Sequence, residues 1–570
     1  MILDGRKIEP GEVLRADACV IGSGAAGITA ALELARPGLE VVVLEAGGFR
    51  ADDESQDPSR GELEPGTDHD PLELVRQRRL GGTTTQWGGR CAPLQPIDFE
   101  RRDWIPGSGW PIGLETLRPY YERAHAYCEL GAFEYDDTRA LPAAEPFVVG
   151  ARQSLLEDGG LWRWSPPVNF WRRYRQRLEQ AVQVRVLHHA TVTRLDRDPV
   201  GGAVERAVVA GGTERRFEVE ARAFVLAGGG LESARLLLAS NEQTPAGIGN
   251  ERDLLGRFYM THPVAEVGSV ELADSATAAA AGGFQLTRDA VYCRRMIRLQ
   301  DDVHREHDLL NLAVALWYPE PGDPTHSDAL LSTFALVRAG MARGRVDWKS
   351  TGIHRRYGEI DDVPGHVANV ARGLPALGSY GAMWARRRWL SRRTLPSFMT
   401  SPESGLMRLR FDAEQSPEAE NRVTLSRERD AFGVPRLSLA YRVSASDRER
   451  IARGLTVVGI ELDRLGAAGV ELPPAEEALA ELKLGDGTHQ LGLTRMAGSP
   501  GQGVVDGDCR VHGARNLAVV SSSVFPTAGA VGPTLTIVAL AIRAAEGLAR
   551  ELTVRAPFAV ELVPQTEHQP

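Results

Sequence analysis

The sequence of 570 residues is poor in cysteine, and its five cysteines lie far apart. No C-x-x-C pair is present and the number is odd, so we expect neither a zinc site nor a disulfide framework. The N-terminus lacks the basic region and apolar run of a signal peptide. No apolar stretch reaches the roughly 20 residues that span a bilayer. These absences predict a cytoplasmic protein without a metal site or a membrane partner.

Charge of one sign is not in large excess either. The net charge of −10 is modest for this length, which argues against a nucleic-acid partner and mildly favours a neutral or cationic substrate. Apolar residues make up 43% of the chain and charged residues 25%, as in soluble globular proteins. A chain of this length exceeds one hydrophobic core, so we expect two or more domains.

What the sequence does have is a glycine-rich turn near its start. Residues 19–21 predict a buried strand, Gly22, Gly24 and Gly27 follow, and residues 28–34 predict a helix. In this G-x-G-x-x-G spacing the first glycine permits a tight turn and the second lets a pyrophosphate approach the backbone. The third lets the helix pack closely on the strand. Ala25 and Ala26 open that helix, whose N-terminus favours phosphate.

An acidic residue stands where a dinucleotide site needs one. A second predicted strand, 40–44, is followed by Glu45 and Ala46. Glu45 lies 21 residues after Gly24, close to the ~20 expected for the acid that binds a ribose hydroxyl. The whole pattern predicts a dinucleotide site, and the alternative is an ordinary turn between a strand and a helix.

Two further segments extend this site. Residues 51–71 are acidic and contain proline, which predicts a loop or lid. Residues 79–90 are too rich in glycine for a regular helix and predict either a cofactor wall or a surface turn. The candidate cofactor residues of this loop are Gly81, Gly82, Thr83, Thr84, Gln86, Trp87 and Gly88.

A second strand, glycine turn and helix occur at 223–240. This unit contains the candidates Ala227, Gly228 and Ser233. Between the two units we expect helices at 114–130 and from 172, followed by strands at 184–187, 191–195 (with the candidate Val192), 203–209 and 216–219. Two such units so far apart imply one α/β domain assembled from separated segments.

The character of the sequence changes between 266 and 484. Short alternating strands are predicted at 309–317, 330–337, 407–411 and 423–425, which suits an antiparallel sheet and a substrate domain. Arginines also gather beside Trp384 and Trp389. This cluster favours a solvated helix face or a subunit contact, and contact with an anionic surface is the alternative. Its members are Arg386, Arg387, Arg388, Arg392 and Arg393.

The last region contains His489-Gln-Leu-Gly-Leu-Thr-Arg-Met, a short strand at 516–520, and Gly532-Pro533-Thr534 at a helix start. Together with the earlier segments it resembles the glucose–methanol–choline (GMC) oxidoreductase family, most strongly at 17–50, 79–120, 221–263 and 485–550. Leu255-Gly-Arg-Phe-Tyr-Met-Thr-His262-Pro and residues 414–426 also match family segments.

The resemblance implies an FAD-binding Rossmann-like domain from 1–265 and 485–570, with a cofactor-loop insertion at about 51–180. A smaller α+β substrate domain would occupy 266–484. Ser522, Gly532, Pro533 and Thr534 would join the cofactor residues named above, since a helix start stabilises negative charge on a reduced flavin. The nearest branch is the bacterial one that resembles pyranose and glycoside oxidases. In pyranose 2-oxidases a loop histidine attaches FAD covalently. Gln86 stands at that position, so non-covalent FAD is implied.

The family oxidises an alcohol to a carbonyl, and the residue that matches its catalytic base is His489. The substrate would be a sugar, a glycoside or an aminosugar-like alcohol, and the acceptor that reoxidises the flavin is open between oxygen, a quinone and another partner. One departure matters, because Gly532 replaces the usual active-site Asn or His. Two alternatives therefore stay open: a lyase of the same family that uses FAD structurally, and a non-catalytic flavin-binding protein.

Overall fold

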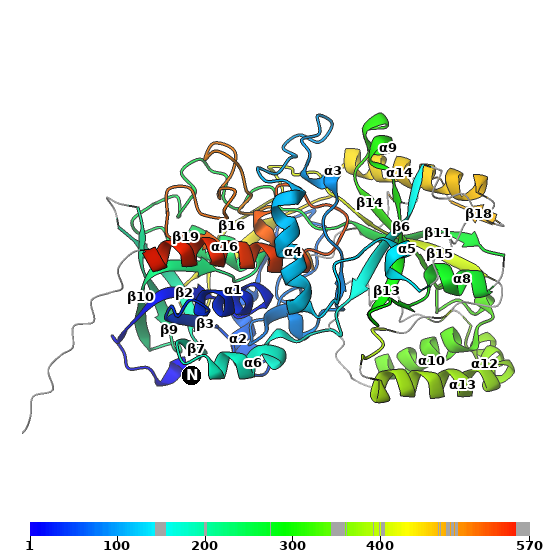
Figure 1. The fold of residues 1–570 in the computed structure, drawn as a ribbon, viewed down its shortest axis with the longest axis horizontal. Helices are drawn as coiled ribbons and strands as arrows, with labels where there is room; N and C mark the ends of the chain where they lie inside the picture. The colour runs from blue at the N-terminus through cyan, green and yellow to red at the C-terminus, as the bar shows by residue number, and fades with distance from the viewer. Residues whose placement is uncertain are drawn as a thin grey trace, which may run out of the picture.

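A computed structural model gives the fold of the chain (Figure 1). It describes all residues except 143–154, 199–201, 274, 344–359, 361, 392, 398–399, 401–404, 466, 468, 473, 475–478, 480–483, 485–487 and 555–570. Arg392 of the arginine cluster therefore lies outside the described residues. Within the described part, no helix is both long and apolar enough to cross a membrane, and no group of three or more metal-ligating side chains is found.

The first sheet joins strands from the two ends of the chain and from the middle. Its order is β1-β7-β3-β2-β10-β9-β8, and β19 pairs with β10. The strand bounds are β1 Ile2–Asp4, β2 Val13–Ile21, β3 Val41–Leu44, β7 Val184–His188, β8 Thr191–Arg197, β9 Val204–Ala210, β10 Arg216–Leu226 and β19 Leu517–Val519. All pairings from β1 across to β10 and β19 are parallel. The prediction of one α/β unit built from separated segments is confirmed.

Parallel strands of this kind need cover on both faces, and β3 is buried along its whole length. Helices α1 (Ala25–Ala35), α4 (Leu114–Cys128) and α16 (Thr534–Val554) pack against one another beside this sheet (Figure 1). Helix α6 is Phe170–Gln180 and α7 is Gly230–Ala239. The strands expected at 216–219 and 223–226 are one continuous strand, β10.

The second sheet is antiparallel, in the order β18-β11-β15-β14-β13-β6-β5, with β12 on β13. Its strands are β5 Arg90–Cys91, β6 Leu156–Trp164, β11 Val264–Glu271, β12 Gln285–Leu286, β13 Tyr292–Leu299, β14 Leu312–Trp317, β15 Leu406–Ala413 and β18 Gly469–Glu471. The sheet thus includes β5 and β6, which come from the part of the chain before residue 265. Helices α8 (Ser275–Gly282) and α14 (Ala445–Arg464) pack on it.

A third, small sheet contains β16 (Arg422–Arg429), β17 (Pro435–Ala440) and β4 (Gly61–Leu63). The strand expected at 423–425 therefore exists, but it pairs here and not in the large antiparallel sheet. The remaining short helices are α2 Asp53–Gln56, α3 Pro96–Phe99, α5 Asp137–Ala140 and α9 Asp301–Glu306.

The strand predicted at 330–337 is wrong, because this segment lies in helix α10 (Ala329–Arg343). Leu331 and Ala335 are both buried, and their spacing of four residues is helical. Helix α12 (Val363–Arg372) packs on α10, where His366 and Asn369 bond the Ser332 hydroxyl at 3.0 and 3.1 Å. Helix α13 (Leu374–Ala385) and a π-helical turn, Arg386–Leu390, complete this helical group.

Candidate active site

The glycine turn joins the two strand–turn–helix units. A Cβ on Gly22, which has φ +104°, would lie 2.5 Å from the carbonyl oxygen of Ala227. A Cβ on Gly27 would lie 1.9 Å from the carbonyl oxygen of Gly22, so α1 can cross the strand only with glycine there. Gly24 differs, because no atom lies within 4 Å of its Cβ position. The turn is therefore closely packed at Gly22 and Gly27 and leaves open space in front of Gly24.

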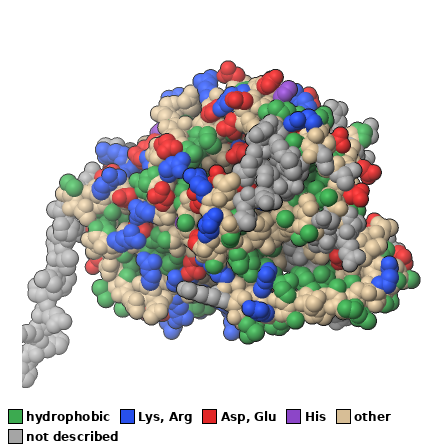
Figure 2. Space-filling view, turned by 45° about the vertical axis from the view of Figure 1, so that its right-hand side comes forward, with side chains coloured by type: hydrophobic (Ala, Val, Ile, Leu, Met, Phe, Trp, Pro, Cys, Tyr) green, Lys and Arg blue, Asp and Glu red, His purple; other side chains and the backbone are tan. Residues whose placement is uncertain are grey.

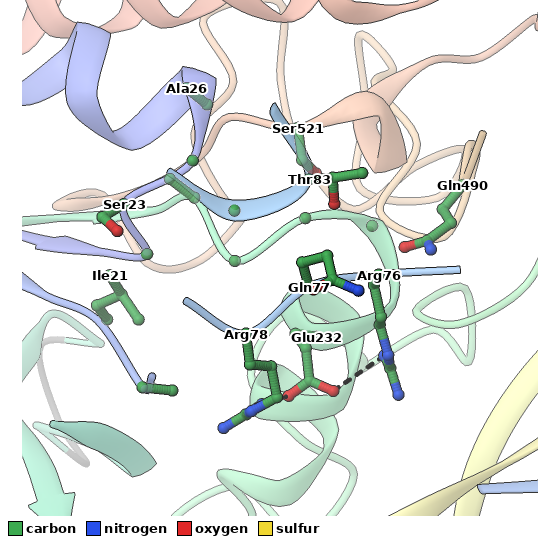
Figure 3. A pocket seen from close by; sticks show the side chains of 18 of the residues that line it. Ile21, Ser23, Ala26, Arg76, Gln77, Arg78, Thr83, Glu232, Gln490 and Ser521 are labelled. Carbon is green, nitrogen blue, oxygen red and sulfur yellow. Dashed lines mark hydrogen bonds and ion pairs between the residues drawn. The ribbon is translucent and has the colours of Figure 1, made fainter. Parts of the chain in front are cut away.

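That space is part of a large cavity along the C-terminal ends of β2, β3 and β10 (Figure 3). The opening of a parallel sheet at its strand ends is the usual place for a nucleotide. The cavity continues from the glycine turn to the N-terminus of α16. Sixteen of the predicted cofactor residues line it together with His489: Gly22, Gly24, Ala25, Ala26, Glu45, Ala46, Gly82, Thr83, Thr84, Trp87, Val192, Ala227, Gly228, Ser522, Pro533 and Thr534.

Six predicted residues lie outside the lining. Gly27 and Gly81 are packed against the backbone and against Trp171, respectively. Gln86 and Gly88 are solvent-exposed, while Ser233 is buried within α7. Gly532 stands next to His489 and not in the lining itself.

The Glu45 carboxylate holds the start of the turn. One oxygen accepts bonds from the Ser23 N–H at 2.9 Å and the Ser23 hydroxyl at 2.7 Å, and the other accepts from the Gly47 N–H at 3.0 Å. A carboxylate accepts about four hydrogen bonds. Glu45 therefore fixes Ser23 and keeps capacity for a ligand hydroxyl in the cavity.

A buried ion cluster in the cavity was missed by the sequence analysis. Glu232 on α7 lies between Arg76, at 2.9 Å, and Arg78, at 2.7 Å (Figure 3). Arg235 pairs with Asp430 at 2.6 Å beside them. Burial raises the pKa of the Glu232 carboxyl, but the three arginines outweigh this and lower its pKa to about 2. The closely spaced arginines in 76–79 were the available signal.

His489 reaches the other end of the cavity, opposite Gly532. If Gly532 carried a Cβ, that atom would lie 3.9 Å from Cε1 and Nε2 of His489 and 3.5 Å from the carbonyl oxygen of Arg90. These are ordinary contact distances, and no side chain fills the space. The Nε2 edge of the imidazole therefore faces an open position at the start of α16.

The opposite edge of the His489 ring contacts a second histidine. His262 Nδ1 lies 2.6 Å from His489 Nδ1, and His262 Nε2 lies 3.1 Å from the carbonyl oxygen of Ala528. A carbonyl only accepts, so His262 Nε2 must be protonated, which leaves its Nδ1 as an acceptor. His489 Nδ1 is then the donor. In the neutral ring, His489 Nε2 has a free lone pair directed away from His262.

Both imidazoles are held neutral. Burial and, after it, the positive charge of Arg90 lower the pKa of His489 to about 4, against the opposing effect of Asp412. Burial, followed by the neighbouring His489, lowers the pKa of His262 to about 4. At pH 7 the pair is a neutral donor–acceptor chain that ends in a basic nitrogen.

Next to this pair, the antiparallel sheet presents cationic and aromatic side chains. Arg90 binds Asp412 through two bonds of 2.6 and 2.8 Å and lies 4.9 Å above the ring centre of Trp162. Arg410, two residues from Asp412 and so on the same face of β15, lies 4.9 Å above Trp317. Burial raises the pKa of Asp412, but Arg90 overcomes this and lowers it to about 2. The pair is ionised and rigid.

The comparisons with known proteins agree with this architecture. The FAD dependent oxidoreductase model matches residues 17–248, and the GMC oxidoreductase model matches residues 417–541. Paromamine 6'-oxidase of Streptomyces fradiae is 27% identical over 95% of this chain and 92% of its own length. C-glycoside 3-oxidase of Arthrobacter globiformis is 38% identical over 22% of this chain and 23% of its own length. Pyridoxine 4-oxidase of Mesorbium loti has the same fold, with a TM-score of 0.53, 17% identity and coverage of 95% of this chain and 100% of its own.

The C-terminal part of the chain, residues 417–541, is similar to the GMC oxidoreductases. With the match of residues 17–248, this similarity identifies an FAD-dependent oxidoreductase, and the matched ranges contain the glycine turn, Glu45, His489 and Gly532. His262 lies in neither matched range. Its segment resembles a GMC segment, but the sequence alone did not predict its contact with His489. Gly532 has no side chain to bond His489, and the polar partner that His489 does have, His262, comes from a different part of the chain.

Proposed function

We propose that this FAD-dependent oxidoreductase oxidises a CH–OH group of a sugar, glycoside or aminosugar-like alcohol to a carbonyl. Relatives whose names specify such substrates support this class, among them paromamine 6'-oxidase and C-glycoside 3-oxidase. The observation that carries the proposal is the hydrogen-bonded chain from Ala528 through His262 to His489. It supports a base with a free lone pair beside an open position.

The cavity fits non-covalent FAD. Gly24 leaves open space where a pyrophosphate would approach the first turn of α1, whose N–H groups are free to donate. The start of α16 would face the reactive ring, and Gln86 is exposed and has no nucleophilic nitrogen. When bound, FAD supplies the acceptor for the hydride that leaves the carbinol carbon. Glu45 would bind the ribose hydroxyl.

In the proposed reaction, His489 Nε2 accepts the proton of the substrate hydroxyl. The His489 Nδ1–H keeps its bond to His262 while the ring becomes positively charged, and His262 is held by Ala528. Asp412 lies near enough to His489 to favour the charged ring electrostatically. A positioned base of this kind contributes about 10²–10⁴-fold to the rate.

We further propose that the antiparallel sheet is the substrate wall. Trp317 is partly exposed and offers an apolar surface. The partly exposed Arg90 and Arg410 offer donors to hydroxyl or ether oxygens, with the buried Trp162 supporting Arg90 from below. Substrate binding is thereby assigned to residues 266–484 together with strands β5 and β6, which belong to the same sheet. The lyase alternative was motivated by the lack of a partner at Gly532, and the bond to His262, which orients His489 as a base, supports oxidation over it.

An anaerobic titration tests the proposal. The purified yellow protein is mixed with a panel of sugars, glycosides and aminoglycosides, and the absorbance of the oxidised flavin is followed. We expect at least one member to bleach the flavin, and His489→Ala to slow bleaching by about 10²–10⁴-fold at unchanged flavin content. If product forms without bleaching, the enzyme is a lyase; if nothing in a broad panel reacts, the substrate class is wrong.

A further inference from the structure

Helices α10, α12 and α13 and the turn Arg386–Leu390 form a helical lobe at the lower right of Figure 1, away from α1 and α16. The lobe has its own internal packing, because α12 is bonded to Ser332 of α10 through His366 and Asn369. It takes no part in the FAD cavity or in the His262–His489 pair. Its role must therefore be sought on its surface.

The outer surface of the helical lobe is unusually apolar. No residue of α13 or of the turn that follows it is buried. Trp389 is 72% exposed and Leu390 is 83% exposed. Among the described residues, 13 large hydrophobic side chains are exposed, and six of them belong to this lobe: Val337, Val363, Val367, Leu374, Trp389 and Leu390. Figure 2 shows hydrophobic side chains along the lower margin of the molecule with basic ones beside them.

The same surface is basic in an acidic protein. Residues 363–402 contain six arginines and no Asp or Glu, whereas the whole chain has a net charge of −10. Arg386 and Arg387 are exposed next to Trp389 and Leu390, while Arg388 is held inward by a bond to the carbonyl oxygen of Leu395 at 2.8 Å. Exposed tryptophan and leucine with arginine beside them are the side chains that bind at the boundary between lipid headgroups and acyl chains.

We infer that the helical lobe binds the surface of an anionic lipid bilayer, with Trp389 and Leu390 inserted and Arg386 and Arg387 on the headgroups. An anionic surface attracts the lobe and repels the acidic remainder, so charge selects this face. A second copy would place one basic face against another, which costs energy. The attachment is peripheral, because no helix of the described chain could cross the bilayer. It amends the expectation that the chain has no membrane partner.

Co-sedimentation of the FAD-loaded full chain with vesicles tests the inference. The vesicles are phosphatidylcholine alone or phosphatidylcholine with about 30% phosphatidylglycerol. We expect binding to the anionic vesicles only, weakened when salt is raised from about 0.05 M to about 0.5 M. Arg386→Gln with Arg387→Gln should weaken the partition by about 25-fold, since each arginine near such a surface contributes about fivefold. Trp389→Ser with Leu390→Ser should abolish it at unchanged flavin content.

Matched controls keep the test specific. Arg50→Gln with Arg172→Gln removes two exposed arginines elsewhere, and Val182→Ser removes a valine that is 92% exposed. Both controls should bind vesicles as the parent does. Equal loss in the controls, or no binding of the parent to anionic vesicles, overturns the inference. Two other partners of the lobe would also overturn it, provided that neither the parent nor the variant binds vesicles. One is a second copy of the chain, shown if the Trp389–Leu390 variant is a monomer where the parent is a dimer. The other is an acidic protein, shown if the parent binds it and the variant does not.

Discussion

Removing the His262 imidazole is the most direct test of how His489 is made a base. In His262→Ala the His489 Nδ1–H loses its acceptor, which now lies at 2.6 Å. The ring is then free to carry its proton on Nε2, the atom that must accept one from the substrate. The imidazole also becomes free to rotate, because within the described residues its ring forms a hydrogen bond only with His262.

The size of the effect is bounded by the role of the base itself. General-base catalysis contributes about 10²–10⁴-fold, so His262→Ala cannot cost more than the upper end of that range. We expect kcat to fall by about 10²-fold, which corresponds to about 2.7 kcal/mol in the activation free energy. The Michaelis constant should change little, since His262 is separated from the open position by the His489 ring.

Stopped-flow reduction of the flavin under anaerobic conditions measures this step without the reoxidation reaction. Flavin content and melting temperature serve as controls for folding. His262→Asn, whose side-chain oxygen can take the place of Nδ1 as acceptor, should recover part of the rate. His262→Gln, whose amide nitrogen can replace Nε2 as donor to Ala528 but whose oxygen is then not at the place of Nδ1, should recover less.

The double variant decides between two roles. If His262 acts through His489, then His262→Ala should add nothing to the loss already caused by His489→Ala, because coupled residues are strongly non-additive. Multiplying losses would mean that His262 contacts the substrate itself. Full activity of His262→Ala would refute the argument from the Ala528 carbonyl.

Three further predictions concern the cofactor, the core and pH. Gly24→Val should give a colourless protein because its side chain would fill the open phosphate space, whereas Gly113→Ala, equally uncrowded and outside the cavity, should stay yellow by absorbance. Arg102→Met should lower the free energy of unfolding by about 3–5 kcal/mol in a denaturant titration, because the fully buried Glu414 carboxylate loses its two bonds to Arg102, of 2.6 and 2.7 Å. Replacing Arg102 and Glu414 together by apolar residues should cost less, because no unpaired charge is then left buried. Stability should fall as pH drops from 6 to about 4.5, by about 2.7 kcal/mol per pH unit in melting experiments. Four histidines whose pKa is lowered to about 3–4 stay largely neutral when folded and take up protons on unfolding, while two buried carboxyls with pKa raised to about 6 release theirs, so these six groups take up about two protons in total. The histidines are His125, His262, His304 and His489, and the carboxyls are Asp98 and Asp447; an unchanged melting temperature across this range would contradict it.

The sequence predicted the parts of this protein whose function depends on local backbone geometry. Gly22 and Gly27 are required by contacts within a few residues or with one matching turn, so their spacing is visible in the chain. Strand β3 and the C-terminal ends of β2 and β10 are continuous apolar runs, which are visible in the chain in the same way. Residues 330–337 were misassigned because a short apolar segment fits both a strand and a helix, and packing of α12 on α10 decides between them.

Side chains that meet across the fold left no such pattern. Arg76 and Arg78 meet Glu232 across more than 150 residues, and Arg90 meets Asp412 across 322. Charged residues at these positions have the same appearance in the sequence as charged residues on a surface. Only the assembled sheets show that they are buried and paired.

Gly532 shows how far a motif can be trusted at a reacting centre. Read along the chain, a glycine in place of Asn or His means that the base has lost its partner. In the fold, His489 has two edges, and the motif position describes only the Nε2 edge, which Gly532 leaves open. The Nδ1 edge is served by His262, 227 residues away in the chain, and that contact determines which nitrogen carries the proton. The missing side chain at Gly532 therefore enlarges the space for a substrate beside Nε2. The contact of Nδ1 with His262, on the opposite edge, makes Nε2 the basic nitrogen.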